Sequence, residues 1–298
     1  MQLKLPVVGE TTEPQRNPLI LEHPNCPICL MREGIAVSQS HFFDYLTKIL
    51  ECPHCQIAWM EKQLSEKGLK QFYKHNYRYM KQERFDLSRY IGDLVRSRSQ
   101  LSYWKDLVPR TARILEIGAA YGVNANYLYT QGYRNLVLNE WDSANFELHS
   151  LPRLQIDDRC LSEYPSASFD FIILSHVLEH FNNIGNTIET LLRLLAPGGL
   201  IFTEVPNAAN PHVHRQMNKS FHYYFFTNKS LEQIWRRYGY RASMCQAFGK
   251  SELISRMRPE RREEYAQAVM GDPFFDDIVA LDGSHPKAFW LRAIIDRR

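Results

Sequence analysis

The sequence lacks the long apolar segments that mark membrane and secreted proteins. No apolar stretch approaches the roughly 20 residues that a membrane-spanning helix needs. The first ten residues contain no hydrophobic core followed by a cleavage site, so we expect no secretory signal and a cytoplasmic protein.

The sequence also lacks a large excess of charge of one sign, internal repeats and low-complexity tracts. The formal net charge of +3 is too small to require a polyanionic partner. What remains is an ordinary globular protein, with 44% hydrophobic and 23% charged residues. Its 298 residues are enough for two domains and a sizeable core.

Cysteine is rare, but four of the six cysteines fall into two close pairs. The pairs are Cys26-Pro-Ile-Cys29 and Cys52-Pro-His-Cys55, and in a reducing compartment such pairs indicate metal ligands rather than disulfides. Four thiolates form the tetrahedral set of a structural zinc site, so we predict that these four residues bind Zn²⁺. The alternatives are four reduced cysteines or a redox pair. A redox motif should lie within a βαβ pattern, whereas these flanks are rich in proline.

The pattern of the chain predicts three parts. Residues 1–62 comprise an extended arm and a zinc-binding lobe that is too small to form its own core. Residues 63–108 contain no proline and repeat apolar residues at helical intervals, which predicts a helical linker. Residues 109–298 alternate strand and helix patterns, with a charged segment at 250–286 that we expect to be a helical insertion.

The most informative stretch is Ile114-Leu-Glu-Ile-Gly-Ala-Ala-Tyr-Gly122. An apolar run followed by two glycines and a helical segment predicts a buried strand, a tight turn and a helix N-terminus, which together present N–H groups to a ligand. A second apolar run ends at Glu140, where a carboxylate can accept hydrogen bonds from ribose hydroxyls. The order and spacing of these elements predict a site for a nucleoside-containing cofactor.

The glycine pattern favours one cofactor class over another. A dinucleotide site needs Gly-x-Gly-x-x-Gly, but after Gly118 the other two positions hold Ala120 and Val123. The pattern Glu116-x-Gly118-x-x-x-Gly122 instead resembles motif I of the class I S-adenosylmethionine-dependent methyltransferases. One departure is Ala120, where members of that family usually have glycine.

The resemblance continues downstream and covers roughly residues 105–248. Residues 169–174 resemble the fourth strand of the family, Ala196-Pro-Gly-Gly199 the turn before the fifth, and residues 200–207 that strand. The resemblance implies an α/β fold with a doubly wound, mostly parallel, Rossmann-like sheet of seven strands. It also implies that a late strand, at residues 289–295, inserts antiparallel beside the fifth.

The resemblance assigns the residues that bind S-adenosylmethionine. Glu140 would bind the ribose, and the turn after the first strand would hold the methionine end. The residues of that turn are Glu116, Gly118, Ala119 and Gly122.

Two further cofactor contacts are expected after later strands. Family members often place an acid after the third strand against the adenine, and Asp158 is our candidate, although Asp157 and Cys160 also match by spacing. Ser175 and His176 follow the fourth strand, where open sheets bind their ligands.

Two histidines are candidates for the general base. We expect His180 to take this role or to orient the cofactor pocket, with a histidine bonded to backbone as the alternative. His222, in a loop expected over the substrate, is the second candidate, with a solvated histidine as the alternative. The segment from His176 to His180 also resembles the Glu-x-x-Glu-His metal segment of polyprenyl dihydroxybenzoate methyltransferases, but His176 replaces the first acid.

The sequence leaves three functional hypotheses. The first is a methyltransferase acting on oxygen or nitrogen of a small molecule, sugar or glycan precursor, as the zinc-lobe layout resembles bacterial enzymes of polysaccharide or natural-product assembly. The second is an RNA methyltransferase whose zinc lobe recognises RNA. Residues 72–79 interleave aromatic and basic side chains, which suits RNA contact, although a helix with an aromatic core face gives the same pattern. The third is a non-catalytic module that binds the cofactor.

Overall fold

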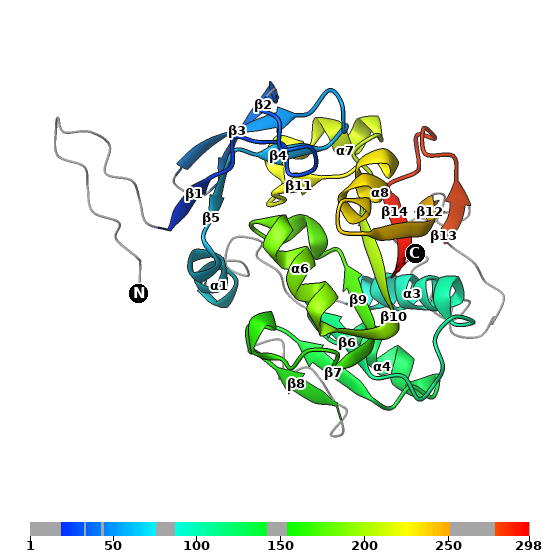
Figure 1. Ribbon diagram of the computed structural model, residues 1–298. Helices are drawn as coiled ribbons and strands as arrows, with labels where there is room; N and C mark the ends of the chain where they lie inside the picture. The colour runs from blue at the N-terminus through cyan, green and yellow to red at the C-terminus, as the bar shows by residue number, and fades with distance from the viewer. Residues whose placement is uncertain are drawn as a thin grey trace.

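The computed structural model describes residues 19–32, 34–42, 45–75, 87–141, 154–250 and 278–297. Its centre is one main sheet of eight strands in the order β13-β12-β14-β10-β9-β6-β7-β8 (Figure 1). The strands of the main sheet are β6 (Ile114–Ile117), β7 (Leu136–Asn139), β8 (Gln155–Asp157), β9 (Phe169–Ser175), β10 (Leu195–Pro206), β12 (Tyr240–Lys250), β13 (Ile278–Leu281) and β14 (Trp290–Arg297).

Helices connect and cover these strands. The described helices are α1 (Glu66–His75), α3 (Leu87–Trp104), α4 (Val123–Thr130), α6 (Ile184–Leu194), α7 (Pro211–Arg215) and α8 (Asn228–Arg236), with short 3₁₀ turns η1 (Leu161–Glu163), η2 (Leu178–His180) and η3 (Met217–Lys219). None of them is long and apolar enough to cross a membrane.

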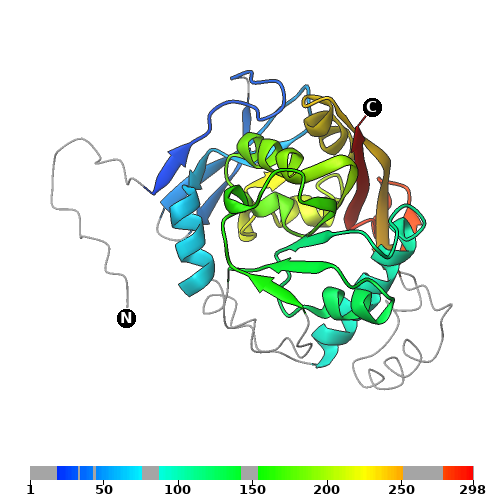
Figure 2. The same ribbon diagram turned by 60° about the horizontal axis from the view of Figure 1, so that its bottom comes forward.

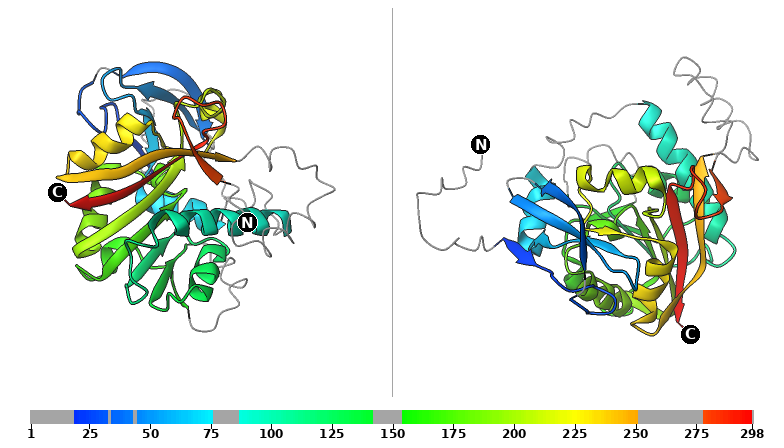
Figure 3. Two further views of the ribbon diagram at one scale, coloured as in Figure 1. Left: turned by 90° about the vertical axis from the view of Figure 1, so that its right-hand side faces the viewer. Right: turned by 90° about the horizontal axis from the view of Figure 1, so that it is seen from above.

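The main sheet is mostly parallel, as predicted. Strands β8, β7, β6, β9 and β10 run in one direction. Strand β14 pairs antiparallel with β10, which confirms the predicted insertion of a late strand beside the fifth. In the left view of Figure 3, β14 (red) lies between β12 (gold) and β10 (green).

The predicted number of strands is wrong, because the main sheet has eight and not seven. The additional strand is β13, which pairs antiparallel with β12 and lies within the segment predicted to be a helical insertion. Its sequence, Ile-Val-Ala-Leu, is short and rich in β-branched residues, and the charge-rich residues before it concealed this signal. Residues 251–277 of the predicted insertion lie outside the described residues.

Alternate side chains of the parallel strands face two separate cores. Leu115 and Ile117 of β6 pack in the core that contains α6 and α8, whereas Ile114 packs in the core that contains α3 and α4 (Figures 1 and 2). Because helices cover both faces, β6 is buried along its whole length, and its sequence is an almost continuous apolar run.

The described part of the N-terminal lobe comprises strands β1 to β5, drawn in blue in Figure 1. Strands β2 and β3 form an antiparallel hairpin between the two cysteine pairs. Strand β4 pairs on its other side with β11, which comes from the opposite end of the sequence. The strands are β1 (Ile20–Glu22), β2 (Ile35–Phe42), β3 (Tyr45–Glu51), β4 (Ala58–Met60), β5 (Lys62–Leu64) and β11 (Tyr224–Phe225).

The structure differs from the predicted division of the N-terminal third. The linker predicted to be helical from residue 63 starts as a strand, because β5 pairs antiparallel with β1 and only then does α1 begin. The predicted extended arm falls on residues 1–25, of which residues 1–18 lie outside the described residues. One expectation does hold, that the lobe forms no core of its own, since Ile49 and Trp59 belong to the same buried cluster as α6 and α8.

Candidate active site and metal centre

A cavity of about 420 Å³, here called the main cavity, lies at the carboxyl ends of β6, β7 and β9. In the order β9-β6-β7-β8 the chain passes from β6 to β7 and β8 on one side and then to β9 on the other side of β6, so this is the switch point at which open α/β sheets bind ligands. Its volume is that of a small-molecule site.

The turn between β6 and α4 has an unusual backbone. Gly118, Ala120 and Gly122 all have positive φ angles of 68°, 46° and 66°. A Cβ atom on Gly118 would lie 2.5 Å from Cγ2 of Val177, so the close approach of two segments also requires glycine there. Ala120 adopts the left-handed conformation that glycine tolerates more easily, which is where the sequence departs from the family pattern.

Glu140 joins this turn directly. Its Oε2 accepts a hydrogen bond of 2.8 Å from the backbone N–H of Ala120. The glycine turn and the carboxylate that follows the second strand therefore line one cavity, as the sequence predicted. The bond fixes the orientation of the carboxylate.

Glu116 is the buried acid of the turn. Its side chain is 5% exposed, and Oε1 accepts a hydrogen bond of 2.9 Å from Nδ2 of Asn124. The second oxygen is buried without a hydrogen-bond partner among the described residues. Burial raises the pKa of this carboxyl to about 7, the bond from Asn124 lowers it, and the nearby Glu140 raises it. Since Glu116 lines the main cavity, it can bind a cationic or hydrogen-bond-donating part of a ligand.

His176 lies between two buried carboxylates. Its Nδ1 is 3.4 Å from Oε1 of Glu179, and its Nε2 is 3.2 Å from Oε1 of Glu204. Burial lowers the pKa of His176, but the two carboxylates outweigh that effect and the net pKa is raised. Glu204 also pairs at 2.5 Å with Nε of the fully buried Arg292.

His180 and His222 lie against each other in the wall of the main cavity. Their ring centroids are 4.7 Å apart in an edge-to-face arrangement. Nδ1 of His180 lies 2.9 Å from the hydroxyl of Tyr73 and 3.1 Å from the carbonyl oxygen of Phe221. Both contacts hold the imidazole in place, and both come from segments distant in sequence.

One side-chain group in the main cavity can hold a metal, and it differs from the segment of His176 to His180 that the sequence offered for comparison. Ligand atoms of Glu179, His180 and His222 lie within 4.8 Å of one another. That segment contains His176, whose two ring nitrogens lie against Glu179 and Glu204, whereas His222 comes from a later loop.

The structure brings most of the predicted ligand residues together. Asp158 is exposed and does not line the main cavity, whereas Leu161 of η1 does. Gly122 caps α4 without lining the cavity. The predicted residues that line it are Glu116, Gly118, Ala119, Glu140, Ser175, His176, His180 and His222.

Sequence reasoning missed the walls contributed by helices before the first strand. Tyr73 and Leu69 of α1 line the main cavity, and so do Arg96 and Gln100 of α3. The polar side chains of α3 that line the cavity recur three or four residues apart, which places them on one face. A sequence alone does not say which surface such a polar face contacts.

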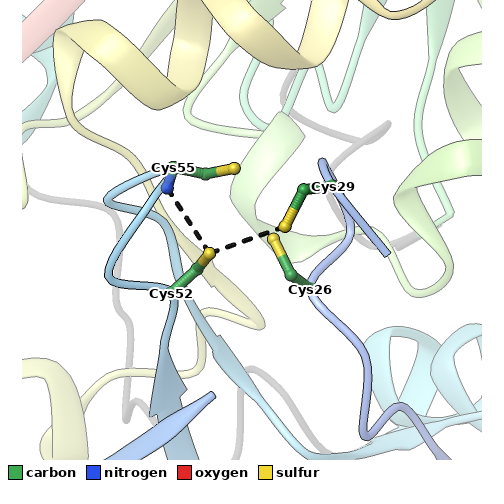
Figure 4. A group of neighbouring side chains, drawn as sticks. All are labelled: Cys26, Cys29, Cys52 and Cys55. Carbon is green, nitrogen blue, oxygen red and sulfur yellow. Dashed lines mark hydrogen bonds between the residues drawn. The ribbon is translucent and has the colours of Figure 1, made fainter. Parts of the chain in front are cut away.

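The four paired cysteines converge in the N-terminal lobe (Figure 4). All four Sγ atoms lie within 4.8 Å of one another, and those of Cys29 and Cys52 are 3.7 Å apart. Tetrahedral coordination at a Zn–S distance of about 2.3 Å gives an S–S separation of about 3.8 Å, so the thiols fit zinc.

The two cysteine turns share one hydrogen-bond pattern. Leu30 N–H donates to the Cys26 carbonyl, and Gln56 N–H donates to the Cys52 carbonyl, each at 2.9 Å. Leu30 and Gln56 both have positive φ angles, and a backbone N–H faces Sγ of Cys26 and of Cys52 at 3.4 Å. Burial raises the pKa of Cys26 to about 12, so a cation is needed to hold it as a thiolate.

Comparisons with known proteins agree with this geometry. A family model described as a methyltransferase domain matches residues 83–243, just over half of the chain. No curated protein matches the sequence.

Solved structures resemble the chain at low sequence identity. One is an S-adenosylmethionine-dependent methyltransferase from Archaeoglobus fulgidus, with a TM-score of 0.53 and 13% identity over 74% of this chain and all of that one. Another comes from a complex between the Haloferax volcanii Trm112 methyltransferase activator and the putative methyltransferase, with a TM-score of 0.51 and 13% identity over 70% of this chain and 93% of that one. A third is the Burkholderia thailandensis 1,6-didemethyltoxoflavin-N1-methyltransferase, with a TM-score of 0.48 and 16% identity over 87% of this chain and 99% of that one. At these identities, the first two likenesses show the fold alone.

Proposed function

Because the chain belongs to the methyltransferase domain family, we propose that it methylates an oxygen or nitrogen of a small molecule, sugar or glycan precursor. The observation that carries this proposal is the meeting of three features in the main cavity. These are the glycine turn, the carboxylate of Glu140 bonded to that turn, and the pair His180 and His222. A site that binds an adenosyl group and faces two imidazoles is suited to proton removal beside a methyl donor.

The residues of the main cavity fit S-adenosylmethionine, which supplies a methyl group already activated by its sulfonium. Glu140 binds the ribose, because its carboxylate follows the second strand and the bond from Ala120 holds it beside the glycine turn. Glu116 offers a buried, unpartnered oxygen to the methionine end. Gly118 leaves room where a Cβ would meet Val177. The chain therefore contributes chiefly alignment, which is what an in-line displacement requires.

His180 takes the proton of the acceptor. The carbonyl of Phe221 can only accept a hydrogen bond, so the tautomer with a proton on Nδ1 satisfies this contact. The lone pair then lies on Nε2, and His222 packs edge-on against the same ring. The hydroxyl of Tyr73 contacts the same Nδ1 atom at 2.9 Å and can also accept from it.

The alternative of an RNA acceptor has less support in the described part of residues 72–79. Phe72 is 2% exposed and packs in the core, and Tyr73 lines the main cavity. Neither is presented on the surface as a platform for stacked bases. Residues 76–79 lie outside the described residues.

We also propose that Cys26, Cys29, Cys52 and Cys55 bind one structural Zn²⁺. The 3.7 Å separation of Cys29 and Cys52 sulfurs and the matching hydrogen bonds of the two turns support this assignment. All four positions are then occupied by protein, so the ion has a structural role.

Replacing either histidine by glutamine tests the catalytic assignment. The variants His180→Gln and His222→Gln should keep the affinity for S-adenosylhomocysteine, measured by calorimetry, and lose turnover by roughly 100-fold or more, as for a general base. His212→Gln is the matched control, because His212 lies in the same loop region but not among the residues lining the main cavity. Unchanged turnover in both cavity variants would refute the assignment.

The acceptor class requires a separate measurement. The protein should transfer labelled methyl from S-adenosylmethionine to the small-molecule fraction of a bacterial extract and not to its purified RNA. If the label stays with the RNA on an ultrafiltration membrane and is released by ribonuclease, the result would favour the RNA enzyme instead. Binding of S-adenosylmethionine without any labelled product would favour a non-catalytic module.

A further inference from the structure

The residues that line the main cavity divide into two groups of different chemistry. The carboxylate, guanidinium and amide side chains come from α3, β6, α4 and the ends of β7 and β9, apart from the buried Glu179. We call this group the polar lining. Other segments, chiefly α1, η2 and the loop before β11, contribute apolar and aromatic side chains. This second group, here called the aromatic wall, comprises Leu69, Tyr73, Trp141, His180, Phe181 and His222.

Four rings of the aromatic wall form a continuous series. The ring centroid of Trp141 lies 6.4 Å from that of Tyr73, which lies 6.2 Å from that of His180. His180 in turn lies 4.7 Å from His222, and neighbouring rings in the series are inclined by 59° to 88°. These four side chains and Phe181 are all half-buried, so ring surface is left for a ligand in the cavity.

The aromatic wall offers few partners to a sugar or a phosphate. A bound sugar buries several hydroxyl groups, and each of them needs a hydrogen-bond partner. The carboxylate beside the wall, Glu179, is fully buried and faces His176 at 3.4 Å. Arg96 is the only lysine or arginine among the described residues that line the main cavity, and it belongs to the polar lining. Lys70 lies near the wall but donates to the carbonyl of Asp158 and does not line the cavity.

The histidines of the wall suit an acidic hydroxyl group. An imidazole has a typical pKa of about 6.5 and a phenol a typical pKa of about 10, so an imidazole can remove a phenolic proton with a moderate cost. An aliphatic or sugar hydroxyl is far less acidic, and the same transfer would cost much more. The base and the wall therefore favour the same kind of acceptor, a hydroxyl group on an aromatic ring.

We propose that the acceptor is a planar aromatic compound with a ring hydroxyl group, which packs against the rings of the aromatic wall. The inference rests on the proposed function and narrows its acceptor class. The phenolic oxygen forms a bond to the methyl carbon, the electron pair of the broken S–C bond stays on sulfur, and the phenolic proton passes to Nε2 of His180. The products are an aryl methyl ether and S-adenosylhomocysteine. Offset and edge-to-face contacts between rings stabilise such a complex beyond the burial of apolar area alone.

Phenol and cyclohexanol are a matched pair of probes, because they have nearly the same size and differ in aromaticity. On protein saturated with S-adenosylhomocysteine, titrations followed by saturation-transfer NMR should give phenol a Kd roughly 10-fold lower than that of cyclohexanol, as expected for two or three ring contacts. Methyl α-glucoside should bind no better than cyclohexanol. With S-adenosylmethionine, labelled methyl should appear on phenol and on neither of the other two probes.

Replacing one ring of the wall tests the contact itself. Phe181→Leu keeps an apolar side chain but removes the ring, so it should weaken phenol binding roughly 2- to 10-fold. The affinities for cyclohexanol and S-adenosylhomocysteine should change less than twofold. Phe289→Leu is the matched control, because Phe289 is also half-buried and does not line the main cavity.

The outcomes distinguish this inference from the proposed function. Failure of phenol to bind, equal affinity for phenol and cyclohexanol, or methyl transfer to the glucoside and not to phenol would overturn the aromatic acceptor while leaving a methyltransferase in place. Failure of the unmodified protein to bind S-adenosylhomocysteine would overturn the proposed function itself. If Phe181→Leu does not fold, the comparison of the three probes on the unmodified protein decides.

Discussion

At the scale of single residues, Glu116 shows how environment determines the chemistry of a predicted position. Its place after the first strand marked it as a ligand residue, but the sequence gave no indication of its protonation. In the structure it is almost fully buried, with a single hydrogen bond from Asn124 and another acid nearby. The ordinary pKa of 4.5 consequently rises to about 7.

The raised pKa predicts a pH-dependent effect of Glu116→Gln on stability. Below pH 4.5 the carboxyl is protonated in both the folded and the unfolded chain. Between pH 4.5 and about 7 the unfolded chain loses this proton first, so Glu116 lowers the free energy of unfolding as the pH rises. The loss is complete above pH 7 and amounts to about 3 kcal/mol. Glu116→Gln should therefore be more stable than the unmodified protein at pH 8 and equally stable at pH 4.5.

Urea denaturation at several pH values measures this difference. The control is Glu189→Gln, because Glu189 is an exposed acid on α6 and should show no such trend. A gain that is the same at pH 4.5 and pH 8 would contradict the buried-acid explanation.

At the scale of elements, the β6–α4 turn combines one required glycine with one strained alanine. Gly118 has a positive φ and no room for a Cβ beside Val177, while Ala120 has a positive φ and a bond to Glu140. The backbone of the turn is thus set by the approach of neighbouring segments and by the bond to Glu140. The sequence motif alone predicted only that the turn is tight.

Two opposite substitutions test this account of the turn. Ala120→Gly should raise the free energy of unfolding by up to about 1 kcal/mol, because it removes left-handed strain at the cost of some unfolded-state entropy. Gly118→Ala should lower it by about 1–3 kcal/mol and weaken binding of S-adenosylhomocysteine, through the contact with Val177. Urea denaturation measures the free energy of unfolding of both variants. The same sign for the two variants would show that something other than backbone strain controls the turn.

At the scale of the whole molecule, the N-terminal lobe and the main cavity are linked through β11. Met60 of β4 donates a 2.9 Å hydrogen bond to the carbonyl of Tyr223, and Tyr223 donates at 2.8 Å to the carbonyl of Glu179. His222 is the preceding residue and lines the main cavity. The cysteine turn that ends just before β4 therefore supports a candidate catalytic histidine.

Loss of zinc should accordingly impair turnover more than cofactor binding. Cys55→Ser should reduce the zinc content from one ion per chain to near zero and lower turnover at least 10-fold, because a structural metal contributes directly to folding of its lobe. Affinity for S-adenosylhomocysteine should change little, since Glu140 and the turn lie on the main sheet. Elemental analysis, turnover and calorimetry check the three quantities. Cys245→Ser is the control, because Cys245 is outside the four-cysteine group. Full turnover in zinc-free protein would contradict the link between the N-terminal lobe and the main cavity.

Short-range patterns predicted the elements that local physics controls. The strand–turn–helix around Gly118 and the parallel strands were confirmed, and so was the antiparallel late strand that the family resemblance implied. The first two depend on apolar periodicity and turn residues within a few tens of residues. The short strand β13 was missed because a charged neighbourhood concealed four apolar residues.

The sequence by itself determined that this is an α/β protein with a glycine turn, an acid after the second strand and four paired cysteines, since these are properties of neighbouring residues. Only the tertiary structure decided which distant segments meet. It placed β11 in the sheet of the N-terminal lobe, Tyr73 against His180, and Arg96 at the wall of the main cavity. The physical reason is that side-chain patterns specify which face of an element is buried, whereas the partner of that face is fixed by the packing of the whole chain.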